Sequence, residues 1–343
     1  MKLREDNVSI KPLLYFITIC FLSMFSATSF ASQNSENWQL YKQHFIAQGR
    51  VVDNGNQQIS HSEGQGYGML LAEINNDRST FEQLWRWTQK NLYREDIGLF
   101  AWRFNPEQHQ SSDRNNATDG DILIGWALLR AGKRWNDQDY IAASEKIQSA
   151  LLSKAVVTWA DKTVMLPGTF GFQHKDFINL NPSYFIFPAW QDFYTHSHRA
   201  KWKKLIDDGL SLLDIMRFGP HKLPTDWVML NKEGSVAPAT DWPSRFSFDA
   251  IRIPLYLNWY KKNLPQNKIF KAYWQTMPSL NTPAWIDVTS NEVAEYPLPP
   301  GMMAVRNISV GNQYNEGGFL TAQEDYYSSS LKLLTYIAEQ EGK

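Results

Sequence analysis

The chain has 343 residues and a formal net charge of −1, and its 43% hydrophobic and 20% charged residues are typical of a globular protein. This length suffices for one large domain or two ordinary ones, and the near-zero charge argues against a nucleic-acid partner. Aromatic residues are numerous, with 14 Trp, 15 Tyr and 19 Phe. Rings in this number can line a groove as well as fill a core.

The N-terminal segment has the pattern of a secretory signal peptide. Three basic residues precede an apolar run over residues 12–25, and residues 29–31 (Ser-Phe-Ala) resemble a cleavage site. We expect a signal peptide over residues 1–31, one domain over residues 32–343 and location in the periplasm or outside the cell. The apolar run is short for a membrane span, so no stable insertion is expected, with an uncleaved anchor as the alternative.

Cysteine and histidine usage excludes several kinds of site. The only cysteine, Cys20, lies inside the apolar run, so the exported chain would contain no thiol nucleophile, Cys metal ligand or disulfide. The seven His residues show no His-Glu-x-x-His pattern, and neither a Gly-x-Ser-x-Gly elbow nor a P-loop occurs.

The rest of the chain predicts amphipathic helices joined by polar loops. Strand signals are few: a hairpin over residues 156–166 and an extended stretch over 222–228. Many helices without a sheet favour paired helices around a common axis, in one domain without an internal linker. In chain order, we expect helices over residues 38–45, 66–74, 79–92, 119–131, 137–157, 182–194, 198–216, 244–262, 268–275, 317–323 and 326–339.

The first segment with chemical character is His-Ser-Glu-Gly-Gln-Gly-Tyr-Gly-Met, residues 61–69. Glu63 stands at an expected helix start, and the small residues Gly64 and Gly66 would let a large ligand approach closely. A carboxyl at this place is favoured as the anion, so a general acid here needs burial or a second carboxylate to keep its proton. Locally, a simple first-turn glutamate is the preferred interpretation.

The second segment is Ala-Thr-Asp-Gly-Asp, residues 117–121, which opens an apolar helix. Thr118 as N-cap and Asp121 three residues later form a capping-box pattern, so the acids need no function. An Asp-x-Asp motif can also bind a metal with a nucleotide sugar, although nothing else in the chain indicates a nucleotide site.

Two further segments combine polar and apolar residues. Asp249 and Arg252 lie three residues apart within Phe-Ser-Phe-Asp-Ala-Ile-Arg-Ile-Pro, which predicts neighbours on one helix face. An ordinary ion pair is one interpretation, but the apolar neighbours indicate a buried or cleft-lining place, where an unused charged pair is costly. In Asn-Pro-Ser-Tyr-Phe, Pro182 indicates a helix start, and Tyr184 is more often a core residue.

Helices, many rings and a few carboxyls best suit glycoside hydrolysis, which uses two carboxyls in an aromatic groove. Together, the four segments resemble glycoside hydrolase family 8 and occur in family order over residues 62–254. The resemblance implies an all-α (α/α)6 barrel of six inner and six outer helices, inversion at the anomeric carbon, and no metal or organic cofactor. One departure is Gly125, where the family signature has Ala.

The resemblance also implies roles for individual residues. Glu63 matches the general acid and Asp249 the general base, with an expected carboxyl separation of about 6.5–9.5 Å. Asp119 matches a residue that binds and helps distort the sugar, and Tyr184 and Arg252 match side chains around the catalytic water and the base.

A further ring is chosen without such a match. Trp102 is our candidate for a sugar-stacking platform, and a core tryptophan is an equally good interpretation.

The length, the export signal and Leu-Pro-Thr-Asp-Trp at residues 223–227 resemble the periplasmic endoglucanases encoded with bacterial cellulose synthase. The implied activity is endo-β-1,4-glucanase on cellulose chains, and the cellulose synthase or export complex is a candidate partner. Trimming of glucan during synthesis is favoured over nutritional breakdown. The alternatives are another β-glycan (lichenan, chitosan or xylan) and a non-catalytic glycan-binding accessory.

Overall fold

The computed structural model describes residues 35–108, 113–311 and 320–342, and the predicted signal peptide lies outside them. Helices dominate this part of the chain, and its strands are only two to four residues long. None of the helices described has both the length and the apolar character to cross a membrane.

Some of the described helices follow one another directly, and longer connections that contain the strands precede α4, α6 and α8. They comprise a first helix described over residues 35–45, α2 (Ser62–Ile74), α3 (Arg78–Asn91), α4 (Thr118–Trp135), α5 (Gln138–Lys154), α6 (Phe187–Ser197), α7 (Ala200–Ile215), α8 (Arg252–Tyr260), α9 (Asn267–Gln275), α10 (Pro300–Val310) and α11 (Tyr326–Glu341), with 3-10 turns η1 (Pro182–Tyr184) and η2 (Ser279–Asn281).

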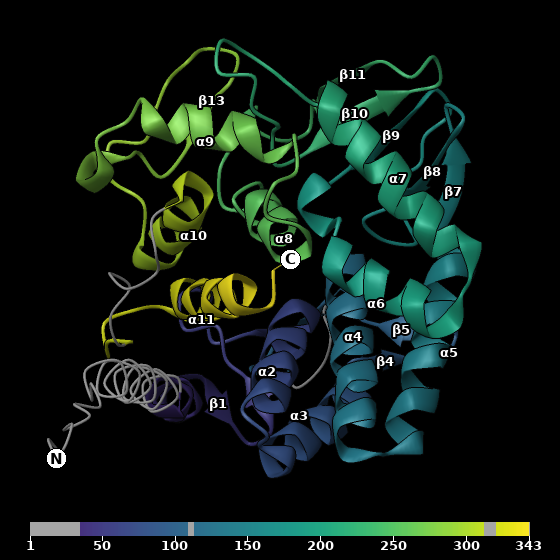
Figure 1. Cartoon of the computed structure of the whole chain (residues 1–343). Coiled ribbons are helices and arrows are strands. Elements are labelled where there is room, and N and C mark those ends of the chain that lie inside the picture. The colour runs from purple at the N-terminus through teal and green to yellow at the C-terminus, as the bar shows by residue number, and fades with distance from the viewer. Residues whose placement is uncertain (1–34, 109–112, 312–319, 343) are drawn as a thin grey trace, which may run out of the picture.

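The inner helices form a closed ring (Figure 1). Helix α2 contacts α4, α4 contacts α6, α6 contacts α8, and α8 contacts α11, which returns to α2; α10 packs against both α8 and α11. Helices α3, α5, α7 and α9 pack outside, each against an inner helix. The fold is therefore the predicted all-α (α/α)6 barrel.

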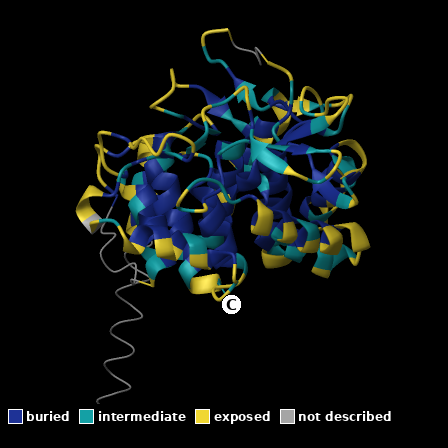
Figure 2. Ribbon diagram, turned by 90° about the horizontal axis from the view of Figure 1, so that it is seen from above, coloured by how far each residue is buried: buried dark blue, intermediate teal, exposed yellow. Residues whose placement is uncertain are grey.

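Inner and outer helices differ in how they are buried (Figure 2). Every residue of α4 from Thr118 to Leu129 is buried, whereas the outer helix α3 buries only a stripe of Phe81, Leu84 and Thr88. A helix that is apolar all round needs neighbours on every side, and a one-sided helix needs a single partner. The sequence pattern thus assigns α4 to the inside of the barrel.

The backbones of α2 and α4 touch each other. A Cβ atom on Gly66 would overlap Leu123 Cβ, and one on Gly64 would lie 2.9 Å from Tyr326 Oη. These glycines serve helix packing, so our expectation that they give room to a ligand is wrong. At Gly125, a Cβ would lie 3.2 Å from Ile147 Cγ2, so the departure from Ala leaves no cavity.

Short strands cover one end of the helices. The predicted hairpin is present as β7 (Val156–Trp159) and β8 (Lys162–Met165), which pair antiparallel. Strands β9 (Phe177–Leu180), β10 (Val228–Asn231) and β11 (Val236–Pro238) form an antiparallel sheet in the order β11-β10-β9. Two-residue pairs join β1 (Ile46–Ala47) to β2 (Arg50–Val51), β3 (Ser60–His61) to β6 (Arg103–Phe104), β4 (Tyr93–Arg94) to β5 (Leu99–Phe100), and β12 (Arg245–Phe246) to β13 (Ile286–Asp287).

Some predicted boundaries are wrong. The expected helix over residues 244–262 begins only at Arg252, because Arg245 and Phe246 pair with β13 instead. The expected helix over 182–194 is interrupted after η1, and α6 restarts at Phe187 with a proline in its first turn. Tertiary pairing and packing therefore overrode the helical period at both places.

Three further expectations need correction. Residues 222–227 are not a strand, and β10 starts at Val228. Helix α10 was not predicted. Of the expected helix over residues 317–323, residues 317–319 lie outside the described part, and residues 320–323 are not helical.

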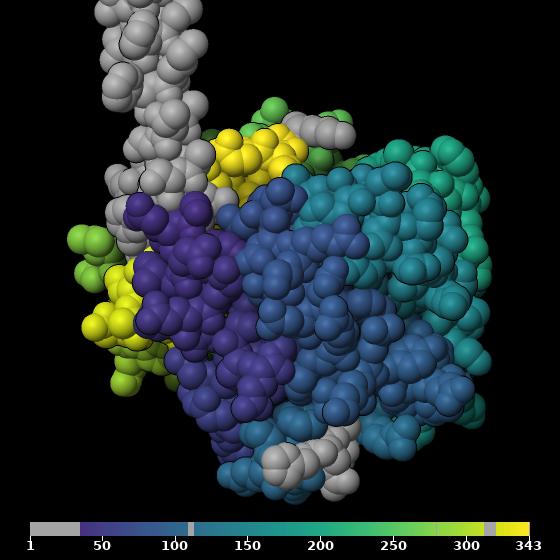
Figure 3. Space-filling model, turned by 90° about the horizontal axis from the view of Figure 1, so that it is seen from below, coloured from purple at the N-terminus to yellow at the C-terminus, as the bar shows by residue number. Residues whose placement is uncertain are grey.

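The two ends of the described chain lie side by side. Tyr41 in the first helix shares a hydrogen bond of 3.0 Å between its Oη and Ser330 Oγ in α11, and both residues are buried. Figure 3 shows the N-terminal residues in purple next to the yellow C-terminal helix. The ring is closed by this contact together with that of α11 and α2.

Candidate active site

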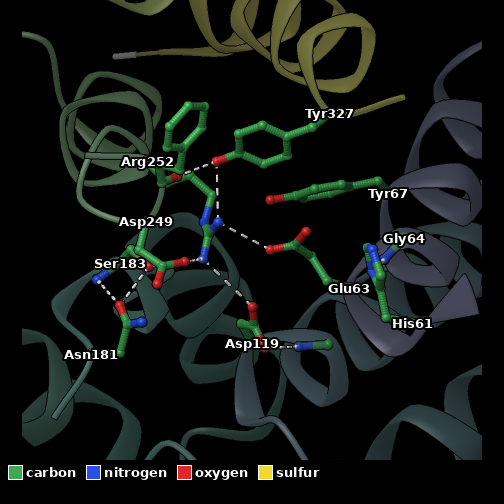
Figure 4. Close-up of polar contacts among 12 residues, drawn as sticks. His61, Glu63, Gly64, Tyr67, Asp119, Asn181, Ser183, Asp249, Arg252 and Tyr327 are labelled. Carbon is green, nitrogen blue, oxygen red and sulfur yellow. Dashed lines mark hydrogen bonds and ion pairs between the residues drawn. The ribbon is translucent and has the colours of Figure 1, made fainter. Parts of the chain in front are cut away.

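Arg252, the first residue of α8, is the centre of a cluster of acids (Figure 4). Its Nη1 lies 3.2 Å from Glu63 Oε2, and its Nη2 lies 2.9 Å from Asp249 Oδ1 and 3.8 Å from Asp119 Oδ2. The Arg252 side chain is only 5% exposed. Three acids from three separate sequence segments therefore meet at one buried guanidinium.

Glu63 is placed by the start of α2. The N-cap of this helix is His61, whose Nδ1 accepts a hydrogen bond of 3.1 Å from the Gly64 backbone N–H. His61 Nε2 lies 3.2 Å from Asp53 Oδ2. Because Nδ1 accepts, Nε2 carries the ring proton and donates to Asp53. An Asp–His pair thus fixes the first turn that carries Glu63.

Asp119 lies in the first turn of α4, and the predicted capping box around it is wrong. The N-cap is Ala117, which makes no side-chain cap bond, and Thr118 Oγ1 donates to Leu166 O instead. Asp121 Oδ1 accepts from Phe100 N at 2.9 Å. Asp119 Oδ1 accepts from Gly120 N at 2.7 Å, which leaves Oδ2 toward Arg252.

Burial and, next, the charge of Glu63 raise the pKa of Asp119 well above its ordinary value, and Arg252 opposes this shift. One guanidinium offsets only one of three carboxylates, so the cluster favours retention of a proton. Asp119 is the acid that shows this effect.

Asp249 lies in the irregular turn just before α8. Its side chain is 31% exposed, against 14% for Glu63 and 5% for Asp119. Of the three acids, it is the one with the most access to solvent. Its contact with Arg252 Nη2 confirms that the two residues are neighbours, but the prediction that they share a helix face is wrong, because Asp249 precedes α8.

Tyr184 and its neighbours supply the wall next to Arg252. Arg252 Nη2 donates to Ser183 Oγ at 2.9 Å, and Ser183 Oγ donates to Asn181 Oδ1 at 2.6 Å. The Tyr184 ring lies 6.0 Å from Arg252 Cζ, a cation–π distance. Tyr184 is therefore at the acid cluster and not simply a core residue.

Trp102 is next to the cluster through its backbone. Its carbonyl accepts from Ser62 N at 3.0 Å, and its indole Nε1 donates to Asp113 Oδ2 at 2.8 Å. The ring is partly exposed, which separates it from the buried core. Among the residues that the structure describes, the Trp102 side chain makes no hydrogen bond to the acid cluster.

A second group of rings, which we call the ring stack, consists of Phe172, Trp227 and Trp242. Trp227 stacks on Trp242 at 4.3 Å and on Phe172 at 5.6 Å between ring centroids, each with 9° between planes. Trp227 also meets Tyr184 edge-on at 6.3 Å, and all three rings of the stack are partly exposed. The ring stack therefore extends from the acid cluster.

Sequence reasoning missed two residues that contact this cluster. Tyr327 Oη accepts from Arg252 Nη1 at 3.1 Å and donates to the carbonyl oxygen of Phe248. Ser183 lies in the Asn-Pro-Ser-Tyr-Phe segment, where the resemblance implies a role for Tyr184 alone. Neither has a local signal, because each acts through Arg252, which is distant in sequence. Among the residues the structure describes, no group of three or more His, Cys, Asp or Glu is placed to hold a metal ion.

Comparisons with known proteins agree with this site. Residues 11–341 match the family described as glycosyl hydrolases family 8. An endoglucanase of Cellulomonas uda is 49% identical over 276 residues, covering 80% of this chain and 77% of the relative. A probable endoglucanase of Novacetimonas hansenii is 38% identical over 311 residues, covering 90% and 91%. The crystal structure of a family 8 endoglucanase from Klebsiella pneumoniae superposes with a TM-score of 0.87 at 48% identity, covering 89% of this chain and 99% of the other.

An α/α barrel with acids gathered beside aromatic rings is the arrangement that a glycoside hydrolase needs. The family match over nearly the whole chain is more specific. This chain belongs to glycosyl hydrolases family 8.

Proposed function

We propose that this protein is an endo-β-1,4-glucanase that cleaves cellulose chains with inversion of configuration. In this mechanism, Glu63 protonates the leaving glycosidic oxygen, and Asp249 removes a proton from the water that attacks the opposite face of the sugar. The transition state resembles an oxocarbenium ion. The single observation that carries the proposal is the convergence of Glu63 and Asp249 on different nitrogens of Arg252.

The exposure of the two carboxyls supports this division of roles. Asp249 is 31% exposed, which suits a base that must meet a water molecule, and Glu63 is 14% exposed. Inversion requires about 6.5–9.5 Å between the carboxyls, whereas about 5 Å accompanies retention. A guanidinium between the two acids, in contact with each through a separate nitrogen, supports the wider spacing.

Asp119 would bind the sugar at the scissile bond. Because its Oδ1 accepts from Gly120 N, a retained proton lies on Oδ2, which can then donate to a sugar hydroxyl. The raised pKa of Asp119 supports this neutral form. The side chains of Tyr184 and Arg252 would surround the attacking water.

The rings near the cluster suit a polymeric sugar. Trp102 and the ring stack are partly exposed, and flat rings pack against the apolar faces of pyranoses. The names of two relatives, an endoglucanase from Cellulomonas uda and a probable endoglucanase from Novacetimonas hansenii, support a β-1,4-glucan as the substrate.

We further propose that the protein is exported by a signal peptide over residues 1–31, and that residues 32–343 form one catalytic domain in the periplasm or outside the cell. Its role would be to trim glucan during cellulose synthesis, with the synthase or export complex as partner. The basic and apolar pattern of residues 1–31 supports export, and the Leu-Pro-Thr-Asp-Trp segment supports the cellulose-associated role.

Hydrolysis is tested with carboxymethylcellulose. We expect the wild type to release reducing sugar and to lower viscosity quickly, which indicates internal cleavage. Glu63→Gln and Asp249→Asn should lose at least about 99% of this activity, the usual scale for acid–base groups. Glu145→Gln and Asp161→Asn, which change exposed acids elsewhere, are the matched controls. Full activity in either catalytic variant contradicts the assignment.

Two further measurements separate the alternatives. NMR of the first product from cellohexaose should show the α-anomer, and a β-anomer would contradict inversion. A panel of lichenan, chitosan and xylan tests the other β-glycans. A higher kcat/KM on one of them than on cellulose would make that polymer the preferred substrate. Glycan binding without hydrolysis of any of these polymers would favour a non-catalytic accessory.

A further inference from the structure

The turn that carries Asp249 receives its main support from an acid outside the cluster described above. Asp226 Oδ1 accepts from Ser247 N at 3.0 Å and from Ala250 N at 2.7 Å. Its Oδ2 forms a short hydrogen bond with Ser247 Oγ. One carboxyl thus binds both ends of the tetrapeptide 247–250, in which Asp249 is the third residue.

Asp226 caps the turn that leads into α8 and not α8 itself. The N-cap of α8 is Ile251, which makes no side-chain cap bond. Within the turn, Ile251 N donates to Ser247 O, and the first N–H groups of α8, those of Arg252 and Ile253, donate to Asp249 O and Ala250 O. The N–H groups of Ser247 and Ala250 come before these bonds, and both donate to Asp226 Oδ1. Asp226 supplies the acceptors that a local Ser, Thr or Asp normally gives at an N-cap.

Asp226 is itself fixed at a junction of secondary structure. Its own N–H donates at 2.7 Å to the carbonyl oxygen of Arg245, the first residue of β12. Thr225 Oγ1 donates to Trp227 O at 2.7 Å, and β10 begins at Val228. The next residue, Trp227, stacks on both of the other rings of the ring stack, Phe172 and Trp242. A carboxyl held this firmly can fix the position of what it binds.

We infer that Asp226 is a positioning residue for the reaction, which holds the backbone of residues 247–250 so that Asp249 reaches the attacking water. This inference rests on the proposed role of Asp249 as general base. Among the residues that the structure describes, the Asp249 side chain bonds to Arg252 alone, so the placement of its carboxyl depends on where the turn lies. Asp226 acts through Asp249 and contacts no sugar in this role.

Asp226 can hold the turn in its neutral form as well as in its charged form. Burial and, next, the charge of Asp249 raise the pKa of Asp226 to about 7, against the bonds from Ser247 and Ala250 that lower it. The backbone bonds do not depend on the charge, because Oδ1 accepts in either form, and Ser247 Oγ can donate to or accept from Oδ2. Asparagine at this position can therefore reproduce all three bonds.

The test compares Asp226→Ala with Asp226→Asn on cellohexaose. A misplacement of about 1 Å can cost about 100-fold in rate, so the Ala variant should lose about 10- to 100-fold in kcat with KM within about twofold of wild type. The Asn variant should recover kcat to within about threefold. Asp208→Ala is the matched control, because Asp208 Oδ2 also accepts from a backbone N–H, that of Thr163, at 2.7 Å.

Ser247→Ala keeps the test valid where Asp226→Ala does not fold. It removes only the hydroxyl bond and should lower kcat by a few fold, again without a change in KM. Wild-type kcat in both Asp226→Ala and Ser247→Ala overturns the inference, as does equal loss in the Asn and Ala variants, which would indicate a role of charge. Activity in Asp249→Asn would instead overturn the proposed function, so the two failures are distinguishable.

Discussion

Ser62 and Gly120 are in direct contact, and a Cβ atom on Gly120 would overlap Ser62 Oγ. Ser62 directly precedes Glu63 in the sequence, and Gly120 directly follows Asp119. The absence of a side chain at Gly120 therefore sets the distance between the starts of α2 and α4. The two acids meet at Arg252 because these helix starts touch.

Gly120→Ala should impair both stability and catalysis. The added methyl group must push α2 away from α4, and overpacking of this kind costs about 1–3 kcal/mol. We expect a lower Tm by circular dichroism and a lower kcat per folded molecule. Gly55→Ala is the control, since its Cβ would meet only Asp53 Oδ1 at 3.4 Å. Unchanged Tm and kcat in Gly120→Ala would show that the helices can separate without consequence.

Arg252→Lys should lower kcat by at least about tenfold. A lysine ammonium is a single point donor and cannot replace a planar fork that reaches Glu63, Asp249 and Ser183 together. Arg130→Lys is the matched control, because Arg130 also binds two acids, at 2.7 Å, but outside the site. We expect that control to lower Tm and leave kcat unchanged. Similar kcat in both variants would contradict the central role of Arg252.

Trp102→Ala should raise the KM for cellohexaose several-fold with little change in kcat, because a stacking platform binds ground state and transition state alike. Trp102→Phe should retain most of the binding. Trp135→Ala is the control, since this partly exposed indole also donates to a side chain, Asn76 Oδ1, at 2.8 Å. A KM unchanged from wild type in Trp102→Ala would remove this residue from the substrate groove.

Gln65→Leu should destabilise the fold although the leucine side chain is similar in size to that of glutamine. The buried Gln65 Oε1 accepts from Val51 N at 2.6 Å, and its Nε2 donates to Thr88 Oγ1 at 2.7 Å. Leucine leaves the Val51 N–H buried without a partner, which costs about 1–3 kcal/mol. Urea unfolding should show this loss, and Gln83→Leu on the exposed side of α3 should not. Equal stability of the two variants would refute the argument.

Asp121 should make stability fall as the pH rises. Burial raises the pKa of Asp121 from 3.8 to about 7, while hydrogen bonds from Asn116 and Phe100 oppose the shift. A raised folded-state pKa gives stability that is full below 3.8 and is lost as the pH rises through about 7.

Asp119 and Asp226 shift in the same direction, so the test compares variants rather than absolute values. The difference in unfolding free energy between about pH 4 and about pH 8 should be smaller in Asp121→Asn than in wild type. Asp161→Asn, an exposed acid in the β7–β8 turn, should leave the difference unchanged. The same pH dependence in wild type and Asp121→Asn would contradict the prediction.

The amino-acid sequence by itself determined most of the helices of this protein and the side chains that can carry out its chemistry. The 3.6-residue period placed most helices, because burial of an apolar face is encoded locally. The four motifs point to Glu63, Asp119, Tyr184, Asp249 and Arg252 from the sequence alone. The sequence misplaced what depends on distant partners: β12 replaced a predicted helix because it pairs with β13, and Thr118 bonds to Leu166 O instead of capping α4.

Only the tertiary structure decided which acids meet and what supports them. Glu63 and Asp249 are far apart in the sequence, and the closed ring of helices brings both to Arg252. The roles of Tyr327 and Asp226 were not predicted, although Asp226 lies in the Leu-Pro-Thr-Asp-Trp segment, because their effect lies in hydrogen bonds to residues of other elements. Glu63 by its neighbours alone was a first-turn glutamate. Its contact with Arg252, beside Asp119 and Asp249, is the physical reason to assign it chemistry.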